Sequence, residues 1–166
     1  MKLSKKNLIE NFKKIKLLVL DFDGVLTDGL VYVDQDGYEM VRCSRRDSMG
    51  TNLLQKAGVK VFVVSKEKNR VVGVRAKKMG IDHIQSVDDK VTVLKKLSKK
   101  LGINPTDICY VGDDLNDFEV MKLTGVSVAV ADADDKIKNI ASYITIKKGG
   151  QGAVREVCDM IVNSKE

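Results

Sequence analysis

Two short acidic clusters in this 166-residue sequence carry carboxylates at a spacing that suits a divalent cation. The first is Asp21-Phe22-Asp23-Gly24-Val25-Leu26-Thr27-Asp28, which follows the apolar run Leu17 to Leu20. Side chains two positions apart in extended backbone point the same way, so Asp21 and Asp23 can share one small site. Two carboxylates that close together repel each other, and a divalent cation relieves this repulsion.

The second cluster is Gly112-Asp113-Asp114-Leu115-Asn116-Asp117, and it follows the apolar run Ile108 to Val111 in the same manner. Open α/β sheets bind ligands at the edge where their parallel strands end, so the two clusters should meet there. Carboxylate, carbonyl and water oxygens suit Mg²⁺ better than a metal that prefers thiolates. The sequence therefore predicts a magnesium site at this edge.

Two further residues between the clusters are suited to an anion. Ser65 ends the apolar run Val59 to Val64 just before a helical segment, so its hydroxyl and nearby amides can hold phosphate oxygens. Lys90 opens another helical segment and can offset negative charge on both phosphate and nucleophile. Each residue alone would be interpreted as a cap, a turn or a surface residue. In this order, the four pieces favour a site for phosphate chemistry.

Short strand-like runs alternate with amphipathic helical segments along the chain, which predicts an α/β fold. We expect a Rossmann-like, three-layer, doubly wound parallel sheet. The strand-like runs are Leu17 to Leu20, Val59 to Val64, Ile108 to Val111, Val126 to Val130 and Tyr143 to Ile146. The helical segments are Ser48 to Lys56, Asn69 to Met79, Lys90 to Leu101, Asn116 to Leu123 and Ala153 to Val162.

We expect one domain over residues 15–163, preceded by a basic lead-in over residues 1–14. One segment breaks the alternation, because the Asp-Gly turn between Leu30 to Val33 and Tyr38 to Cys43 predicts a β-hairpin insertion over about 30–43.

The segments DFDGVLTD, Ser65, Lys90 and GDDLND resemble the four motifs of the haloacid dehalogenase-like phosphatases. The resemblance covers about residues 15–162 and implies the fold of that superfamily. More narrowly, the chain is similar to its sugar-acid branch, through Leu26 to Gly29, the hairpin and GGQGAVREVCDMI at Gly149 to Ile161. That branch includes 3-deoxy-octulosonate 8-phosphate phosphatases, deoxy-nonulosonate 9-phosphate phosphatases and the C-terminal domain of some acylneuraminate cytidylyltransferases.

The resemblance implies a role for each motif residue. Asp21 matches the nucleophile, and Asp23 matches the residue that protonates the leaving oxygen and then activates water. Asp21, the Asp23 carbonyl and Asp113 match the Mg²⁺ ligands. The phosphate holders and supporting residues of the family match Ser65, Lys90, Asp114 and Asp117.

The spacing of the motifs leaves room for a hairpin and single helices but not for a cap domain. Because water must be limited around the reacting phosphate, we expect a neighbouring subunit to cover the site. Capless members of this branch are tetramers whose hairpins build a central barrel, so the resemblance implies a homotetramer.

The substrate is less clearly encoded. Octulosonate phosphatases follow the second-motif hydroxyl with Gly-Arg, whereas this chain has Lys66 and Glu67 there. Glu67, Arg75 and Lys78 resemble the nonulosonate side of the branch, so the resemblance favours a deoxy-nonulosonate 9-phosphate over octulosonate 8-phosphate. Further candidates for substrate or subunit contacts are Asp47, Arg155, Arg45 and Arg46, for which a helix N-cap or an ordinary surface charge is the alternative.

Composition narrows the remaining classes. The net charge is +6, much of it from lysines 2, 5, 6, 13, 14 and 16, but aromatic residues make up only 5% and no nucleic-acid motif occurs, which argues against nucleic-acid binding. The apolar stretches are too short for a membrane span. Cys43, Cys109 and Cys158 are widely separated, which favours reduced thiols in a cytoplasmic protein over zinc ligands.

Two rival functions remain open. A catalytically silent oligomerisation module, like the similar domain of sialic-acid activating enzymes, would lack turnover despite the motifs. A signalling receiver domain also phosphorylates an aspartate beside Mg²⁺, but it places that aspartate after its third strand, where this chain has Ser65.

Overall fold

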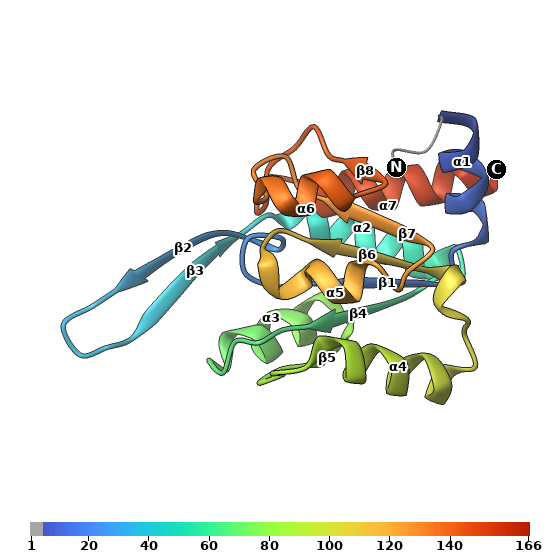
Figure 1. The fold of residues 1–166 in the computed structure, drawn as a ribbon. Helices are drawn as coiled ribbons and strands as arrows, with labels where there is room; N and C mark the ends of the chain where they lie inside the picture. Colours follow the sequence, from blue (N-terminus) through green and yellow to red (C-terminus); the bar gives the residue numbers. More distant parts are fainter. Residues whose placement is uncertain (1–4) are drawn as a thin grey trace.

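The computed structural model describes residues 5–166 and contains a six-stranded, all-parallel sheet in the order β5-β4-β1-β6-β7-β8. Helices cover both faces of this sheet (Figure 1). Its strands are β1 (Leu17–Leu20), β4 (Lys60–Val64), β5 (Asp82–Ile84), β6 (Ile108–Gly112), β7 (Val126–Ala129) and β8 (Tyr143–Ile144). The predicted three-layer, doubly wound α/β fold is therefore confirmed.

The helices are α1 (Lys5–Lys14), α2 (Arg45–Lys56), α3 (Val71–Met79), α4 (Lys90–Leu101), α5 (Phe118–Met121), α6 (Asp135–Ile140) and α7 (Ala153–Lys165). Two 3₁₀ turns lie at Pro105–Asp107 and Leu115–Asp117. Helix α2 packs beside α7 and α3, while α5 packs beside α4 and α6. The chain runs from β1 outward to β5 and then crosses back to β6. Right-handed crossovers consequently place α2 and α3 on one face and α4 to α6 on the other.

The strands form because the runs are apolar on both sides of the pleat, as strands covered on both faces must be. All four residues of β1 and all five of β6 are buried. In register, Leu17 lies beside Ile108 and Leu20 beside Val111, so β1 and β6 end together. Strand β4 lies on the other side of β1. The three strands that precede the predicted motif residues are thus neighbours at the centre of the sheet.

Several element boundaries differ from the prediction for local reasons. Strand β5 was not predicted, because all three of its residues are exposed at the sheet edge and only Ile84 is apolar. The short helix α6 was also missed. Strand β8 ends at Ile144 instead of Ile146, because the amides of Ile146 and Lys147 donate to the Glu156 carboxylate and not to the sheet.

The hairpin insertion is longer than predicted. It consists of β2 (Thr27–Val33) and β3 (Glu39–Cys43) and extends away from the body of the protein (Figure 1). Tyr32 pairs with Met40, and their side chains are 67% and 66% exposed. Residues 5–166 therefore leave about two thirds of Tyr32 and of Met40 uncovered. Between the hairpin and Lys90, residues 44–89 form only α2, β4, α3 and β5, so the described part of the chain contains no cap domain.

The N-terminal segment packs against the domain instead of forming only a solvated lead-in. From Lys5 it forms α1, whose Leu8 and Phe12 are buried in the same core as the sheet. The Phe12 ring lies edge-on to Tyr143 with centroids 6.5 Å apart. The lead-in residues 1–4, including Lys2 of the basic cluster, lie outside the described residues. Among residues 5–166, no helix has the length and apolar character needed to cross a membrane.

Candidate active site

Asp21 lies at the carboxyl end of β1, where the backbone N–H of Asp21 still donates to the Val111 carbonyl of β6 at 3.0 Å. Its side chain is almost completely buried, at 6% exposure. The Phe22 N–H donates to Asp21 Oδ1 at 2.7 Å, and Lys90 Nζ lies 2.7 Å from Asp21 Oδ2. Burial raises the pKa of Asp21 well above its usual value, the charge of Asp117 adds to this, and Lys90 opposes it. Asp21 is therefore a fixed carboxylate with one cationic partner.

Lys90 and Asp117 form a buried ion pair behind Asp21. Lys90 Nζ donates to Asp117 Oδ1 at 2.7 Å, and both side chains are nearly inaccessible to solvent. The second oxygen of Asp117 accepts the Asp113 N–H at 3.0 Å. Burial lowers the pKa of Lys90, but the charges of Asp21 and Asp117 outweigh this and raise it overall. Lys90 consequently stays protonated, and Asp117 holds both Lys90 and the second acidic loop.

Tyr110 is a site residue that the sequence analysis missed. It lies in β6 with no exposed surface, and its hydroxyl donates to Asp117 Oδ1 at 2.7 Å. Burial, followed by the charges of Asp117 and Asp21, raises its pKa well above the usual value, so the phenol remains a neutral donor. The available signal was a tyrosine inside an otherwise apolar strand, since a buried tyrosine hydroxyl needs a partner.

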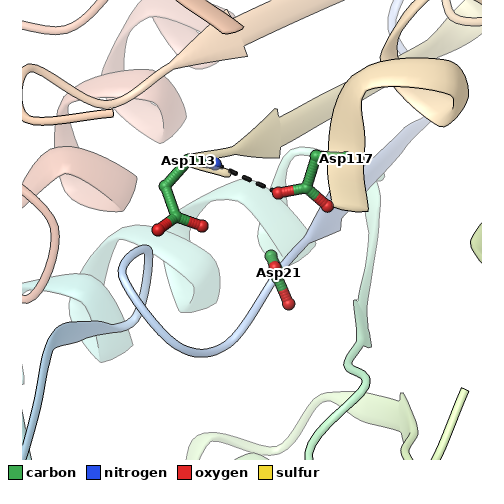
Figure 2. A group of neighbouring side chains, drawn as sticks. All are labelled: Asp21, Asp113 and Asp117. Carbon is green, nitrogen blue, oxygen red and sulfur yellow. Dashed lines mark hydrogen bonds between the residues drawn. The ribbon is translucent and has the colours of Figure 1, made fainter. Parts of the chain in front are cut away.

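Oxygens of Asp21, Asp113 and Asp117 lie within 4.8 Å of one another, and Figure 2 shows these three side chains gathered around the ends of β1 and β6. The predicted ligand set contained Asp21, Asp113 and the Asp23 carbonyl. Burial raises the pKa of Asp113 to about 7, with further contributions from the charges of Asp117 and Asp114. Carboxylates that raise each other's pKa in this way fit a hard divalent cation, and this oxygen-only donor set suits Mg²⁺. Asp117 accepts three hydrogen bonds and each Asp21 oxygen contacts one donor, so Asp113 has the least engaged carboxylate of the three.

Asp23 lies on the tight loop that follows β1. Thr27 Oγ1 closes this loop by accepting the backbone N–H groups of Gly24 and Gly29, each at 3.1 Å. Gly24 has a φ of +75°, and a β-carbon there would collide with the Asp113 carboxylate, so only glycine lets the two acidic loops approach. Burial raises the pKa of Asp23, and the charges of Glu67 and Glu39 add to the shift. A carboxyl with a raised pKa is suited to proton donation.

The motif residues surround a pocket of about 220 Å³. It is lined by Asp21, Asp23, Gly24, Gly29, Ser65, Lys66, Glu67, Asp113, Asp114 and Asn116. Ser65 is buried at the end of β4, and its Oγ accepts the Glu67 N–H at 3.1 Å, which leaves the hydroxyl hydrogen free to donate. Asp114 is exposed at the rim, and its carboxylate accepts the Leu115 N–H. The structure thus gathers the residues of all four predicted motifs, with Lys90 directly behind the pocket.

The substrate candidates divide into two groups. Glu67 lines the pocket, and its Oε1 accepts the amides of Lys68 and Asn69. Arg75 lies outside the pocket and donates to the Ser44 carbonyl and Ser48 Oγ. Lys78 is exposed on α3 and does not line the pocket either. Of these three candidates, only Glu67 lines this chain's own pocket, and a role in substrate recognition stays a prediction for all three.

Asp47 is completely buried and also lies outside the pocket. It is not the N-cap of its own helix, because Ser44 has that position in α2. Instead, Asp47 Oδ1 accepts the Arg155 N–H of α7 at 2.9 Å. The Arg155 side chain pairs with Asp159 on the same helix, and Arg45 and Arg46 are exposed. None of these four residues faces the substrate pocket in this subunit.

Comparisons with known proteins agree with this geometry. Residues 63–157 match the family described as haloacid dehalogenase-like hydrolase. The chain belongs to this family. It is 40% identical over 157 residues to the 3-deoxy-D-manno-octulosonate 8-phosphate phosphatase of Escherichia coli K12, with 94% of this chain and 84% of the relative covered.

Solved structures extend the similarity. The same type of phosphatase from Moraxella catarrhalis, in complex with magnesium ion, phosphate ion and a KDO molecule, is 35% identical with a TM-score of 0.94, covering 98% of this chain and 94% of that one. A cobalt-bound deoxy-D-mannose-octulosonate 8-phosphate phosphatase from Haemophilus influenzae is 33% identical with a TM-score of 0.89, covering 93% and 91%. The predicted family and its capless sugar-acid branch are thereby confirmed, whereas the preference for a nine-carbon substrate finds no support among these relatives.

Proposed function

We propose that this protein is a Mg²⁺-dependent cytoplasmic phosphatase that removes the phosphate of 3-deoxy-D-manno-octulosonate 8-phosphate. One observation carries the proposal: Asp21, Asp23, Ser65 and Asp113 line a single pocket with Lys90 directly behind it. This pocket lies in a chain 40% identical to a phosphatase of that name. A hydrolase of phosphoric monoesters needs a nucleophile, a proton donor and cationic support for the phosphate, and we assign these roles to Asp21, Asp23 and Lys90.

In the first step, a carboxylate oxygen of Asp21 attacks the phosphorus. The bond between phosphorus and the sugar oxygen breaks, and the carboxyl proton of Asp23 passes to that oxygen. The raised pKa of Asp23 keeps its proton available. The hydrogen bond from Phe22 and the contact with Lys90 fix the orientation of Asp21 before attack.

In the second step, the Asp23 carboxylate takes a proton from water, and the resulting hydroxide attacks the phosphorus of the aspartyl-phosphate. The bond to Asp21 breaks, which regenerates its carboxylate and releases inorganic phosphate. Lys90 and the Ser65 hydroxyl hold phosphate oxygens in both steps of the proposed mechanism. Asp117 and Tyr110 keep Lys90 in position.

Asp21, Asp113 and the Asp23 carbonyl would hold the cation. When bound, Mg²⁺ supplies positive charge that offsets the negative charge of the phosphate oxygens and of the surrounding carboxylates. The Asp113 N–H bond to Asp117 supports this role, because it fixes the second acidic loop.

The eight-carbon substrate is favoured by the relatives, whose names specify octulosonate 8-phosphate. Of the three residues that suggested a nine-carbon acid, only Glu67 lines this pocket. The Lys66-Glu67 pair still differs from the Gly-Arg expected after the second-motif hydroxyl. The nine-carbon acid is therefore the competing outcome that the experiment must distinguish.

We propose that a second subunit covers the pocket within a homotetramer. The support comes from the hairpin, where Leu30, Tyr32, Tyr38 and Met40 are each at least 66% exposed. An exposed apolar surface of this kind marks an interaction site in a soluble protein.

The test compares phosphate release from octulosonate 8-phosphate and from a nonulosonate 9-phosphate, each with and without Mg²⁺. We expect Mg²⁺-dependent turnover with a higher kcat/KM for the eight-carbon substrate. Asp21→Asn should abolish turnover and leave the circular dichroism spectrum unchanged, because it removes the nucleophilic charge at nearly constant shape. A higher kcat/KM for the nine-carbon substrate would overturn the substrate assignment, and failure to hydrolyse any phosphoester would favour the silent oligomerisation module.

A further inference from the structure

Helix α7 begins without a cap of its own. Its N-cap residue, Gly152, has a φ of 101° and offers no side chain to the first turn. The Asp47 carboxylate takes this role by accepting the N–H of Arg155, in the first turn of the helix, at 2.9 Å. Asp47 and Arg155 are 108 positions apart in the sequence. A buried carboxylate at a helix N-terminus both satisfies an otherwise unpaired amide and interacts favourably with the helix dipole.

The close crossing of α2 and α7 brings Asp47 to this position. Gly50 is one turn further along α2, and a β-carbon there would lie 3.0 Å from Arg155 Cα and 3.2 Å from Cys158 Cβ. A glycine at the crossing therefore allows the helices to approach more closely than larger residues would. Asp47 is on the same side of α2 as Gly50, since residues three apart lie on one helix face.

The segment just before α7 contacts the loop that carries the proposed nucleophile. The Gly150 N–H donates to the Val25 carbonyl at 3.0 Å. A β-carbon on Gly150 would lie 2.5 Å from the Asp28 amide nitrogen, and one on Gly149 would collide with the Gly24 carbonyl. The turn of residues 149–152 is thus packed directly against the backbone of residues 24–28, with no side chain between them.

Burying the Asp47 carboxylate costs folding free energy. Its Oδ2 has no hydrogen-bond partner, and it shares that condition only with Arg75 Nε among the buried side-chain atoms of residues 5–166. Its contact with α7 does nothing for α2, which Ser44 already caps. A buried carboxylate with an unpaired oxygen is costly, and the Arg155 N–H and the charge of Arg75 offset only part of this cost, because burial is the largest effect on the pKa of Asp47.

We propose that Asp47 is a positioning residue for catalysis: it fixes the first turn of α7, and through the turn of residues 149–152 it holds the loop bearing Asp21 and Asp23. The effect on turnover rests on the proposed function, whereas the effect on the loop does not. Asp47 acts through backbone contacts and touches neither substrate nor cation. Its contribution is to keep the nucleophile loop in one conformation.

The first test measures hydrogen exchange at the amides of Gly24 and Gly29, which close the nucleophile loop through Thr27. Asp47→Ala should speed their exchange about tenfold, because it releases the first turn of α7. Asp47→Asn, which keeps an acceptor oxygen, should restore slow exchange. The matched control is Ser44→Ala, which removes the cap of α2 only and should leave these two amides protected. Equal exchange in Asp47→Ala and Ser44→Ala would overturn the proposal.

A second pair of variants tests the same contact from the other side. Arg155→Pro removes the donor N–H at a helical position where proline is tolerated, and Arg155→Ala removes the side chain but keeps that donor. Only the proline variant should speed hydrogen exchange at the Gly24 and Gly29 amides. Adding Asp47→Ala to the proline variant should have little further effect on this exchange. Full additivity of the two changes would contradict a shared contact. This pair also decides the question if Asp47→Ala does not fold.

Turnover provides the third measurement. On the substrate that the wild type hydrolyses, Asp47→Ala should lower kcat about tenfold with KM nearly unchanged, because a displaced nucleophile loop affects the chemical step. Asp47→Asn should recover most of kcat. An unchanged kcat in Asp47→Ala with an active wild type would overturn the role in catalysis. An inactive wild type would instead count against the proposed function, and the exchange data would still decide whether Asp47 holds the loop.

Discussion

Replacing Tyr110 by phenylalanine isolates one hydrogen bond behind the proposed nucleophile. The change removes a hydroxyl that donates to Asp117 Oδ1 at 2.7 Å and leaves the ring in its buried place in β6. Asp117 keeps two other donors, Lys90 Nζ at 2.7 Å and the Asp113 N–H at 3.0 Å. The variant therefore weakens the support of Lys90 without leaving the carboxylate unpaired.

The expected magnitude follows from these contacts. A hydrogen bond to a charged group contributes about 1.5–3 kcal/mol, and because two donors remain we expect the lower limit, about 1.5 kcal/mol, in the free energy of unfolding. If Lys90 stabilises the transition state for phosphate transfer less by the same amount of free energy, kcat should fall about tenfold. Both quantities can be measured on one preparation, by urea unfolding and by phosphate release at saturating Mg²⁺.

The control is Tyr143→Phe, because its hydroxyl also donates to a carboxylate, Glu156 Oε1, at 2.8 Å but at the edge strand β8. Tyr143→Phe should lower the free energy of unfolding and leave kcat unchanged. If Tyr110→Phe left kcat at the wild-type value while stability fell, the hydroxyl would be structural only. If stability changed by less than about 0.5 kcal/mol as well, the inferred buried network would be wrong.

Three further perturbations test other parts of the structure. Because the pKa of Asp113 is raised to about 7, a proton competes with Mg²⁺ for its carboxylate below that pH. The apparent Kd for Mg²⁺ should therefore rise as pH falls from 7 to 5, and Asp113→Asn should make this Kd less dependent on pH. Burial raises the pKa of Asp47 from 3.8 to about 6, so protonation of Asp47 stabilises the fold fully below pH 3.8, and this contribution is lost as pH rises through 6. In urea titrations, the stability gain of Asp47→Asn over wild type should therefore be about 2 kcal/mol larger at pH 7 than at pH 4, and a constant gain would contradict the shift. Placing Glu at Tyr32 and Lys at Met40 should dissociate the proposed tetramer in light scattering, whereas Ile146→Glu, at a side chain 82% exposed outside the hairpin, should leave the assembly intact.

The central site was predictable because its residues follow strands that end together. In a parallel sheet, residues just past neighbouring strands must converge, so Asp21, Ser65 and Asp113 could be grouped before any geometry was known. Their close approach also depended on Gly24, whose place in the acidic motif made the loop recognisable. The assigned roles of these residues stay predictions until the variants are measured.

Other contacts around the site could not be predicted from the sequence, for physical reasons. Tyr110 belongs to a strand that is apolar in pattern, and nothing local indicates that its hydroxyl meets Asp117. Asp47 was interpreted as a substrate contact or a helix N-cap, because nothing near it in the sequence indicates that its partner is the Arg155 amide, 108 positions away. Arg75 was grouped with Glu67 by family resemblance, but the structure uses its guanidinium to hold the first turn of α2. Long-range partners of buried polar groups are set by tertiary packing, which spacing along the chain does not encode.

The charge balance of the pocket implies an order of binding. The pocket lining contains five acidic residues and one lysine, Lys66, while Lys90 is already paired with Asp21 and Asp117. A phosphate dianion approaching the cation-free site therefore meets more carboxylates than ammonium groups. Burial, followed by repulsion from neighbouring carboxylates, raises the pKa values of Asp21, Asp23 and Asp113; the repelling charges are Asp117 for Asp21 and Asp113, and Glu67 and Glu39 for Asp23. We therefore expect a cation to bind first, because it relieves this repulsion and attracts the substrate phosphate. Inorganic phosphate titrated calorimetrically should bind only with Mg²⁺ present, and equal affinity without the cation would mean that Lys90 and Ser65 alone suffice.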